Sequence, residues 1–372
     1  MMNKQQTYRW HSKLLTSLLC IGMACLLVAC SDDTEQLEQD EDTLQLLTYS
    51  EHLSFMGSPA TRAPIGYEEY TAAPITAYLT PEGASRATTY RYSAISNRWN
   101  SGFKIKDGHT YYIYGFTPSD AVTGSSINYL SGDSYENGAR LTLNGLKPVS
   151  GKDFCLIVGV RQVNSGTAEV PADFKPGNFK YEGKPKNQNF AYMMLHHIYG
   201  ALSFTIKIDE KYSQLRRIKL KKMKLKGVPS VYSTVTMEIR KTSGEDPIGG
   251  NTWTIGSETE DVQFFKNNTG LELTTTAQPL TLEVENEEMD KMMVAPALSS
   301  NLNLVCTYDV YDTNTTTEHP DGNLIRQNCE AENKLPADIV NRGEWRTVNL
   351  TVNPTYLYVL SDPDLDNPTV TF

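Results

Sequence analysis

The sequence predicts an all-β protein made of two antiparallel β-sandwich domains in tandem. Its apolar runs are short, rich in β-branched and aromatic residues, and separated by turn residues, which is the pattern of strands. No stretch keeps an apolar period of 3.6 residues over several turns, so we expect no long helix. The 372 residues suffice for two domains, and a polar segment rich in Gly, Pro and Asn at residues 183–190 is the expected boundary.

The chain begins with the features of a targeting signal. Lys4, Arg9 and Lys13 give it a positive start, and a mostly apolar stretch over residues 14–28 follows. This stretch is short for a membrane span, and small residues lie at its end. We therefore expect residues 1–29 to be a signal peptide. Its removal lowers Lys plus Arg from 34 to 31 against 44 acidic residues, which gives the mature chain a charge of −13.

An acidic segment follows the targeting signal. Seven of the eleven residues from Asp32 to Asp42 are acidic, and such a block repels itself and cannot bury apolar area. We expect residues 30–43 to form an extended tether. The acidity of the mature chain argues against nucleic acid as a partner.

Residues 101–118 predict a β-hairpin. Apolar and basic residues alternate up to Asp107-Gly108, a dipeptide that favours a tight turn. Residues 111–116 then carry aromatic or aliphatic side chains on both parities, so both faces of the returning strand are expected to be covered. Pro118 ends this strand.

Residues 216–227 hold seven basic residues, yet they predict a strand with a lysine-covered solvent face. The apolar side chains change parity midway, with Ile218 and Leu220 before the change and Met223 and Leu225 after it. One extra residue at the two central lysines would restore the register, as a β-bulge does.

Residues 303–329 predict another hairpin, with a long polar tip. If Asp312 pairs with Asn323, Cys306 lies opposite Cys329. Directly opposed residues have Cα separations within disulfide range. The simplest register therefore predicts a Cys306–Cys329 disulfide, and a slipped register with two free thiols is the alternative.

The sequence lacks the common catalytic and metal-binding signatures. His196 and His197 are adjacent, so on a strand their side chains point to opposite faces and do not serve one metal. Cys155 lies in an apolar run and fits a small buried hydrophobic residue. Two aspartate-rich stretches, 309–321 and 362–367, lack the spacing of a calcium loop. We expect no enzymatic activity, no metal and no cofactor, although composition leaves a glycosidase carboxylate pair open.

Several stretches together resemble the fimbrillin family, the lipoprotein pilins of Bacteroides and its relatives. Leu27-Val28-Ala29-Cys30 resembles a lipobox and precedes the acidic tether. The passage from Trp99 to Pro118, with Tyr111 and Tyr114, resembles the family's W…Y-x-x-Y-x-x-x-P pattern. The strand that opens at His197, the segment MMVAP at 292–296 and the ending at 343–360 are similar to further family stretches. The resemblance extends over nearly the whole mature chain.

The resemblance implies two transthyretin-like β-sandwich domains, residues 44–190 and 191–372, in a structural or adhesive pilus subunit. It implies acylation of Cys30 and anchoring in outer-membrane lipid, with the subunit at the cell surface and in the fimbrium. Acidic residues after the lipidated cysteine resemble a surface-export signal, although a spacer on the periplasmic face is the alternative. In that family an arginine-specific surface protease frees an N-terminal strand, and a strand from another pilin subunit replaces it.

Three segments are candidates for this mechanism. Residues 46–55 suit the removable strand, with Leu47 and Tyr49 on its core-facing parity, and residues 58–66 hold two prolines and predict an exposed loop. Cleavage is expected between Arg62 and Ala63. Arg86 is the alternative site.

The C-terminal segment Thr355–Phe372 is the candidate donor strand. Two prolines interrupt its last part. Use of this segment only in the chain's own fold, as in a tip or accessory subunit, is therefore the alternative. A surface glycan-binding lipoprotein of a nutrient-uptake system, with Tyr and Trp stacking on sugars, is the competing function.

Overall fold

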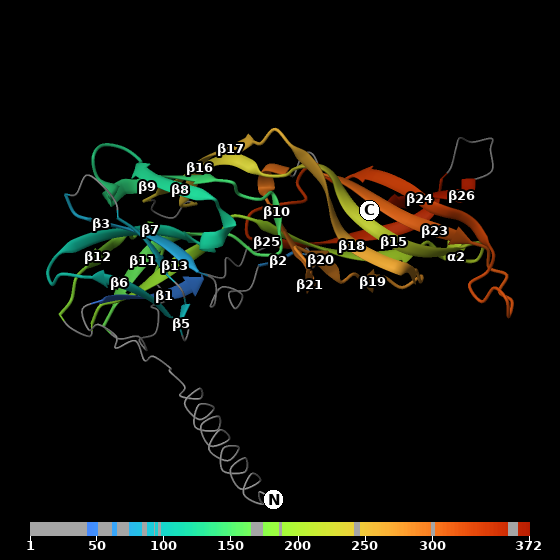
Figure 1. Cartoon of the computed structure of the whole chain (residues 1–372), viewed down its shortest axis with the longest axis horizontal. Coiled ribbons are helices and arrows are strands. Elements are labelled where there is room, and N and C mark those ends of the chain that lie inside the picture. Colours follow the sequence, from blue (N-terminus) through green and yellow to red (C-terminus); the bar gives the residue numbers. More distant parts are fainter. Residues whose placement is uncertain are drawn as a thin grey trace, which may run out of the picture. The chain divides into compact units, whose positions relative to one another are not determined.

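The computed structural model confirms an all-β chain (Figure 1). Among the described residues the helices are short: α2 (Glu210–Ser213), η2 (Ser119–Ala121), η3 (Tyr135–Asn137) and η4 (Pro296–Leu298). No helix in this part of the chain is long and apolar enough to cross a membrane. The structure describes residues 43–50, 62–64, 74–83, 88–92, 94–95, 98–164, 174–185, 188–241, 246–298, 302–355 and 364–372.

A nine-stranded sheet gathers most strands of the first 197 residues. Its strands, in spatial order, are β4 (Thr88–Tyr92), β3 (Ile75–Pro81), β7 (Thr110–Thr117), β11 (Cys155–Val163), β13 (Phe190–His197), β1 (Thr43–Ser50), β6 (Arg98–Lys104) and β5 (Ala94–Ile95), and β12 (Lys180–Glu182) also pairs with β7.

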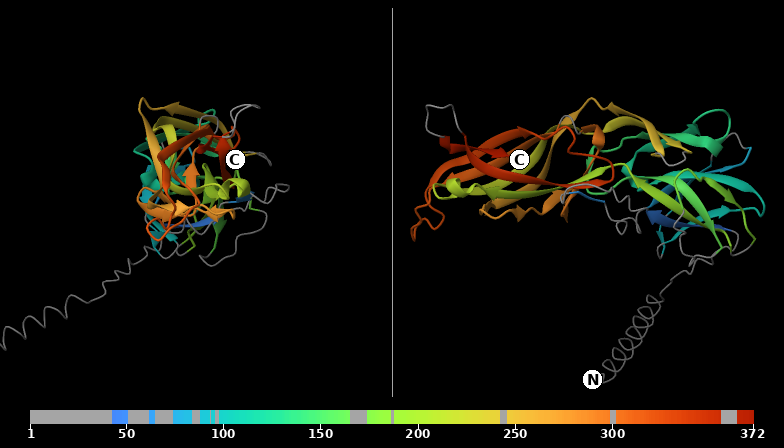
Figure 2. Two further views of the ribbon diagram at one scale, coloured as in Figure 1. Left: turned by 90° about the vertical axis from the view of Figure 1, so that its right-hand side faces the viewer. Right: turned by 180° about the vertical axis from the view of Figure 1, so that it is seen from behind.

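A seven-stranded sheet brings the short strand at residues 62–64 together with the C-terminal strand. Its order is β10 (Val149–Ser150), β22 (Met292–Val294), β14 (Gly200–Ile208), β25 (Glu344–Thr355) and β2 (Arg62–Pro64), with β19 (Gln278–Pro279) on β14 and β26 (Asp364–Thr371) on β25. Seen from behind in Figure 2, β25 and β26 lie side by side in red.

Two four-stranded sheets and one two-stranded sheet complete the fold of the described residues. We call β18 (Thr259–Glu272), β15 (Arg217–Pro229), β23 (Asn303–Tyr311) and β24 (Leu324–Lys334) the lysine sheet. We call β17 (Ile248–Ile255), β16 (Tyr232–Arg240), β9 (Gly138–Asn144) and β8 (Gly124–Tyr129) the shared sheet, because it takes strands from both parts of the chain (Figure 1). The two-stranded sheet holds β20 (Leu282–Val284) and β21 (Glu287–Met289).

The sheets are mixed, so the expectation of purely antiparallel sandwiches is wrong in two places. Strand β1 runs parallel to β13, and β14 runs parallel to β25. A tight turn cannot join parallel neighbours, and each of these pairs is separated by a long stretch of chain. The division at residues 190 and 191 stays a prediction: β13, which begins at Phe190, lies in the nine-stranded sheet, and the seven-stranded sheet begins with β14.

Strand β7 confirms the prediction that both of its faces are covered. Tyr112, Tyr114 and Phe116 lie in the larger hydrophobic cluster, whereas Tyr111 and Ile113 lie in the smaller one. The strand ends at Thr117, before Pro118 as predicted.

The hairpin predicted at residues 101–118 is wrong, because β6 pairs with β1 and β5 and does not pair with β7. The turn at Asp107-Gly108 is present, with Gly108 at φ +69°. However, β12 occupies the edge of β7 that follows this turn, pairing Glu182 with Thr110. A distant strand has therefore displaced the sequence neighbour.

Strand β15 confirms the predicted bulge. Its pairing with β23 shifts register between Leu220 and Lys222. As a result the apolar residues before and after the shift face the same core, and Ile218 and Met223 are both fully buried. The lysines form cross-strand ion pairs, among them Lys221 Nζ with Asp309 Oδ2 at 2.8 Å.

The hairpin of β23 and β24 is confirmed, but the predicted Cys306–Cys329 disulfide is wrong. Asp312 does pair with Asn323 at the tip, through a backbone hydrogen bond of 3.0 Å. Two register irregularities then follow, so Cys306 lies opposite Ala331 and Cys329 opposite Tyr308. Diagonal neighbours are separated by about 7–8 Å, which is beyond disulfide range, and Cys306 is a buried free thiol.

Candidate functional site

The N-terminal strand β1 is an interior strand of the nine-stranded sheet. It pairs in parallel with β13 from Gln45–Phe190 to Ser50–Leu195, and it pairs antiparallel with β6 on its other edge. Leu44 and Leu46 are fully buried in the smaller hydrophobic cluster. The described core-facing side chains therefore have the opposite parity to the predicted one, and residues 51–55 of the predicted strand lie outside the described residues.

The predicted cleavage site lies in β2. Arg62 is opposite Arg346, and Ala63 is opposite Trp345 on β25. The expectation of a loop is therefore wrong for residues 62–64. Proline is tolerated on an edge strand because the missing N–H can face away from the ladder, and Pro64 is the last residue of this short edge strand.

The C-terminal strand β26 also pairs with β25, near the end of β25 that is opposite to β2. Val370 is opposite Val352 and is fully buried. The hydroxyl of Tyr308 donates to the carbonyl of Pro368, and Arg216 Nη2 lies 3.0 Å from Asp366 Oδ1. Residues 364–371 thus serve the chain's own fold. Residues 356–363 of the predicted donor segment lie outside the described residues.

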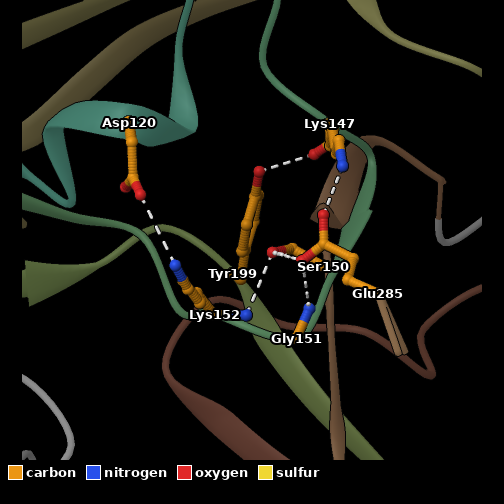
Figure 3. A network of polar contacts seen from close by, with 7 residues as sticks. All are labelled: Asp120, Lys147, Ser150, Gly151, Lys152, Tyr199 and Glu285. Atoms are coloured by element: carbon orange, nitrogen blue, oxygen red, sulfur yellow. Dashed lines mark hydrogen bonds and ion pairs between the residues drawn. The ribbon is translucent and has the colours of Figure 1, made fainter. Parts of the chain in front are cut away.

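A pocket of about 240 Å³ opens where η2, the segment from β9 to β11, the start of β14 and the β20–β21 turn meet. In Figure 3, Glu285 accepts hydrogen bonds from the Lys147 ammonium, the Ser150 hydroxyl and the Gly151 N–H. Tyr199 donates its hydroxyl to the Lys147 carbonyl. These contacts connect residues that are far apart in sequence.

The charges of this pocket are balanced within it. Lys152 Nζ lies 3.4 Å from Asp120 Oδ2, as Lys147 faces Glu285. Burial alone raises the pKa of Glu285, but the hydrogen bonds from Lys147 and the Gly151 N–H outweigh it and lower the pKa below its usual value. No lining residue is a His or Cys. The carboxylates and ammonium groups of the pocket are therefore engaged with one another.

A buried cluster of Asp153, Cys155 and His197 lies at the start of β11 and the end of β13. His197 Nδ1 is 2.6 Å from Asp153 Oδ2 and 3.5 Å from Cys155 Sγ. Cys155 is directly opposite His197 in the β11–β13 ladder, and Asp153 lies two residues before Cys155. The three ligand atoms lie within 4.8 Å of one another, so this is the group of described residues that could hold a metal.

Burial and the contacts within the cluster together shift the pKa values of its groups. Desolvation raises the pKa of the Cys155 thiol to about 12. It lowers the pKa of His197, but the contacts with Cys155 and the Asp153 carboxylate outweigh this and raise the pKa well above its ordinary value. Burial lowers the pKa of the neighbouring His196 to about 4. The adjacent histidines thus have opposite environments, as their opposite faces predict.

Sequence reasoning treated Cys155 as a hydrophobic residue and missed this cluster. A D-x-C spacing at a strand start was the available signal, but His197 becomes its partner only through the β11–β13 register. The predicted lipidation site Cys30 and the alternative cleavage site Arg86 lie outside the described residues.

No family model matches the chain, and no curated protein sequence matches it. Its neighbours among solved structures include fimbrial proteins. It is 14% identical to a fimbrial protein from Bacteroides vulgatus, with a TM-score of 0.47 over 88% of this chain and 97% of that one. It is 10% identical to the fimbrial anchor protein Mfa2 from Porphyromonas gingivalis, with a TM-score of 0.27 over 88% of this chain and 94% of that one.

Proposed function

We propose that the protein is a non-enzymatic, surface-anchored pilus subunit that is activated by cleavage after Arg62 and assembles by strand exchange. The position of β1 carries the proposal. This strand lies between β13 and β6 and buries Leu44 and Leu46, and it precedes the proposed scissile bond in sequence. Once the chain is cut at Arg62, only non-covalent contacts hold β1 in the sheet.

Loss of β1 would open two edges at once. Strand β13 would lose the partners of its residues Phe190 to Leu195. Strand β6 would lose the partners of Trp99, Asn100 and Lys104. Unpaired backbone edges beside an apolar cluster bind further strands readily. A strand of another pilin subunit with apolar residues at the positions of Leu44 and Leu46 would restore both ladders.

The pairing of β2 makes cleavage conditional. A protease binds its substrate as an extended chain in its own active site, so β2 must first leave β25. This requirement protects the uncut subunit during export. Acylation of Cys30 and retention in outer-membrane lipid are parts of the same proposal, and they rest on the lipobox residues before Cys30.

The test treats the chain with an arginine-specific protease and measures both the new N-terminus and the size of the product. We expect a chain that begins at Ala63 and forms filaments visible by electron microscopy. Arg62→Lys keeps the charge but removes the recognised residue, so it should stay uncut and monomeric. Arg86→Lys is the matched control and should behave as the parent does. Filaments from Arg62→Lys, or a cut parent that stays monomeric, would contradict the proposal.

A further inference from the structure

We propose that Asp153, Cys155 and His197 form a zinc site that ties β11 to β13. The donors are a carboxylate oxygen, a thiol sulfur and an imidazole nitrogen, which are the three ligand types that zinc accepts. Two of them come from residues directly opposite each other in one ladder, and the third is two residues away. The backbone therefore fixes their separation before any ion arrives.

The two separations measured from His197 Nδ1 fit this ion, one of them after a small adjustment. Tetrahedral zinc places its nitrogen and sulfur ligands about 3.5 Å apart, and His197 Nδ1 lies 3.5 Å from Cys155 Sγ. It places nitrogen and oxygen ligands about 3.4 Å apart, whereas His197 Nδ1 lies 2.6 Å from Asp153 Oδ2 because a hydrogen bond joins them. A rotation of the Asp153 side chain that moves its carboxylate oxygen by about 1 Å would make room for the ion.

Charge balance also favours an ion at this place. A zinc ion held by a carboxylate, a thiolate and a neutral imidazole has its two positive charges neutralised by two negative ligands. Such a balance suits the buried position, since the side chains of Asp153 and His197 are only 1% and 10% exposed.

A buried ion pair alone would not need the third residue. Asp153 and His197 already satisfy each other, yet the Cys155 sulfur points at the same ring nitrogen. Three protein ligands would leave the fourth position of a tetrahedral zinc ion for water.

The test uses the full chain with the three cysteines before residue 31 replaced by Ser in every sample. The protein is stripped with a chelator and titrated with zinc sulfate or cobalt chloride, each alone. We expect stoichiometric zinc, a thiolate-to-cobalt charge-transfer band and a higher melting temperature. Cys155→Ser should abolish the band and weaken zinc binding by more than about tenfold.

Cys306→Ser is the matched control, because Cys306 is an equally buried thiol without the other two ligands. It should keep both the band and the zinc affinity. Asp153→Asn provides a second variant with a neutral amide of the same shape, and it should lower zinc affinity while circular dichroism shows a folded chain. A stripped parent that takes up no zinc, or a parent and Cys155→Ser with equal affinity and equal bands, would overturn the proposal and leave a hydrogen-bonded ion pair.

Discussion

Replacing Leu46 by Ala tests how firmly β1 is held once the chain is cut. Leu46 is fully buried and lies opposite Ala191 on β13. Truncating a buried leucine costs about 2–5 kcal/mol, because apolar burial is lost and a cavity remains. In the cut subunit the lost free energy weakens the non-covalent binding of the segment that ends at Arg62. A cost of about 3 kcal/mol corresponds to roughly a hundredfold weaker binding.

The assay cleaves the parent and Leu46→Ala at Arg62 and follows the release of the labelled N-terminal fragment by size-exclusion chromatography. Leu304→Ala is the matched control, because Leu304 is also fully buried but lies in the lysine sheet and in the other hydrophobic cluster. It should lower global stability and leave fragment release unchanged. Equal release from the parent and Leu46→Ala would refute the idea that the core contacts of β1 retain it.

Three further predictions concern stability. Lys221→Ala leaves the buried Asp309 without its ammonium partner and should lower the free energy of unfolding in urea by about 2 kcal/mol. Lys226→Ala breaks the exposed pair with Glu332 and should lower it much less. Gly115→Ala would place Cβ 2.2 Å from a backbone carbonyl of β3 and should cost about 3 kcal/mol or more in thermal melts, whereas Gly124→Ala, with its nearest neighbour at 3.5 Å, should be tolerated. The pKa of Glu285 is lowered by folding, so its carboxylate stabilises the fold above the ordinary value of 4.5 and loses that contribution as pH falls through the folded pKa. Glu285→Gln should therefore lose less stability than the parent between about pH 6 and pH 3.

Opposite results would be informative in each case. If Lys221→Ala and Lys226→Ala lower the free energy of unfolding equally, burial of Asp309 does not strengthen its ion pair. A stable Gly115→Ala chain would mean that β3 and β7 can separate without penalty. If the Glu285→Gln chain is as acid-sensitive as the parent, protonation of Glu285 does not contribute to acid unfolding.

The sequence was informative where neighbours along the chain decide the structure. The bulge in β15 follows from the parity change between Leu220 and Met223, which lie three residues apart. The covered faces of β7 follow from its own alternation. The tip of the β23–β24 hairpin was also predicted from Asp312 and Asn323, and only the bulges beyond it changed the register.

Tertiary pairing decided what the sequence did not predict. The parallel neighbours β1 and β13 are separated by about 140 residues, and nothing in either segment specifies the other. The zinc-site candidate has the same origin, because His197 meets Cys155 across a ladder between strands that are not adjacent in sequence. Arg62 was expected in a loop because its neighbouring prolines disfavour central strands, but an edge position accepts them.

The shared sheet limits how this chain can be divided or recombined. Strand β9 pairs with β16 from Gly138–Arg240 to Leu143–Val235, so one backbone ladder crosses from the first part of the chain to the second. A gene split between these strands would yield two products, each with an unpaired sheet edge that fits the other and invites aggregation when alone. Exchange of either part with a related gene must preserve this ladder. The two parts are therefore expected to be inherited together, as one unit of variation.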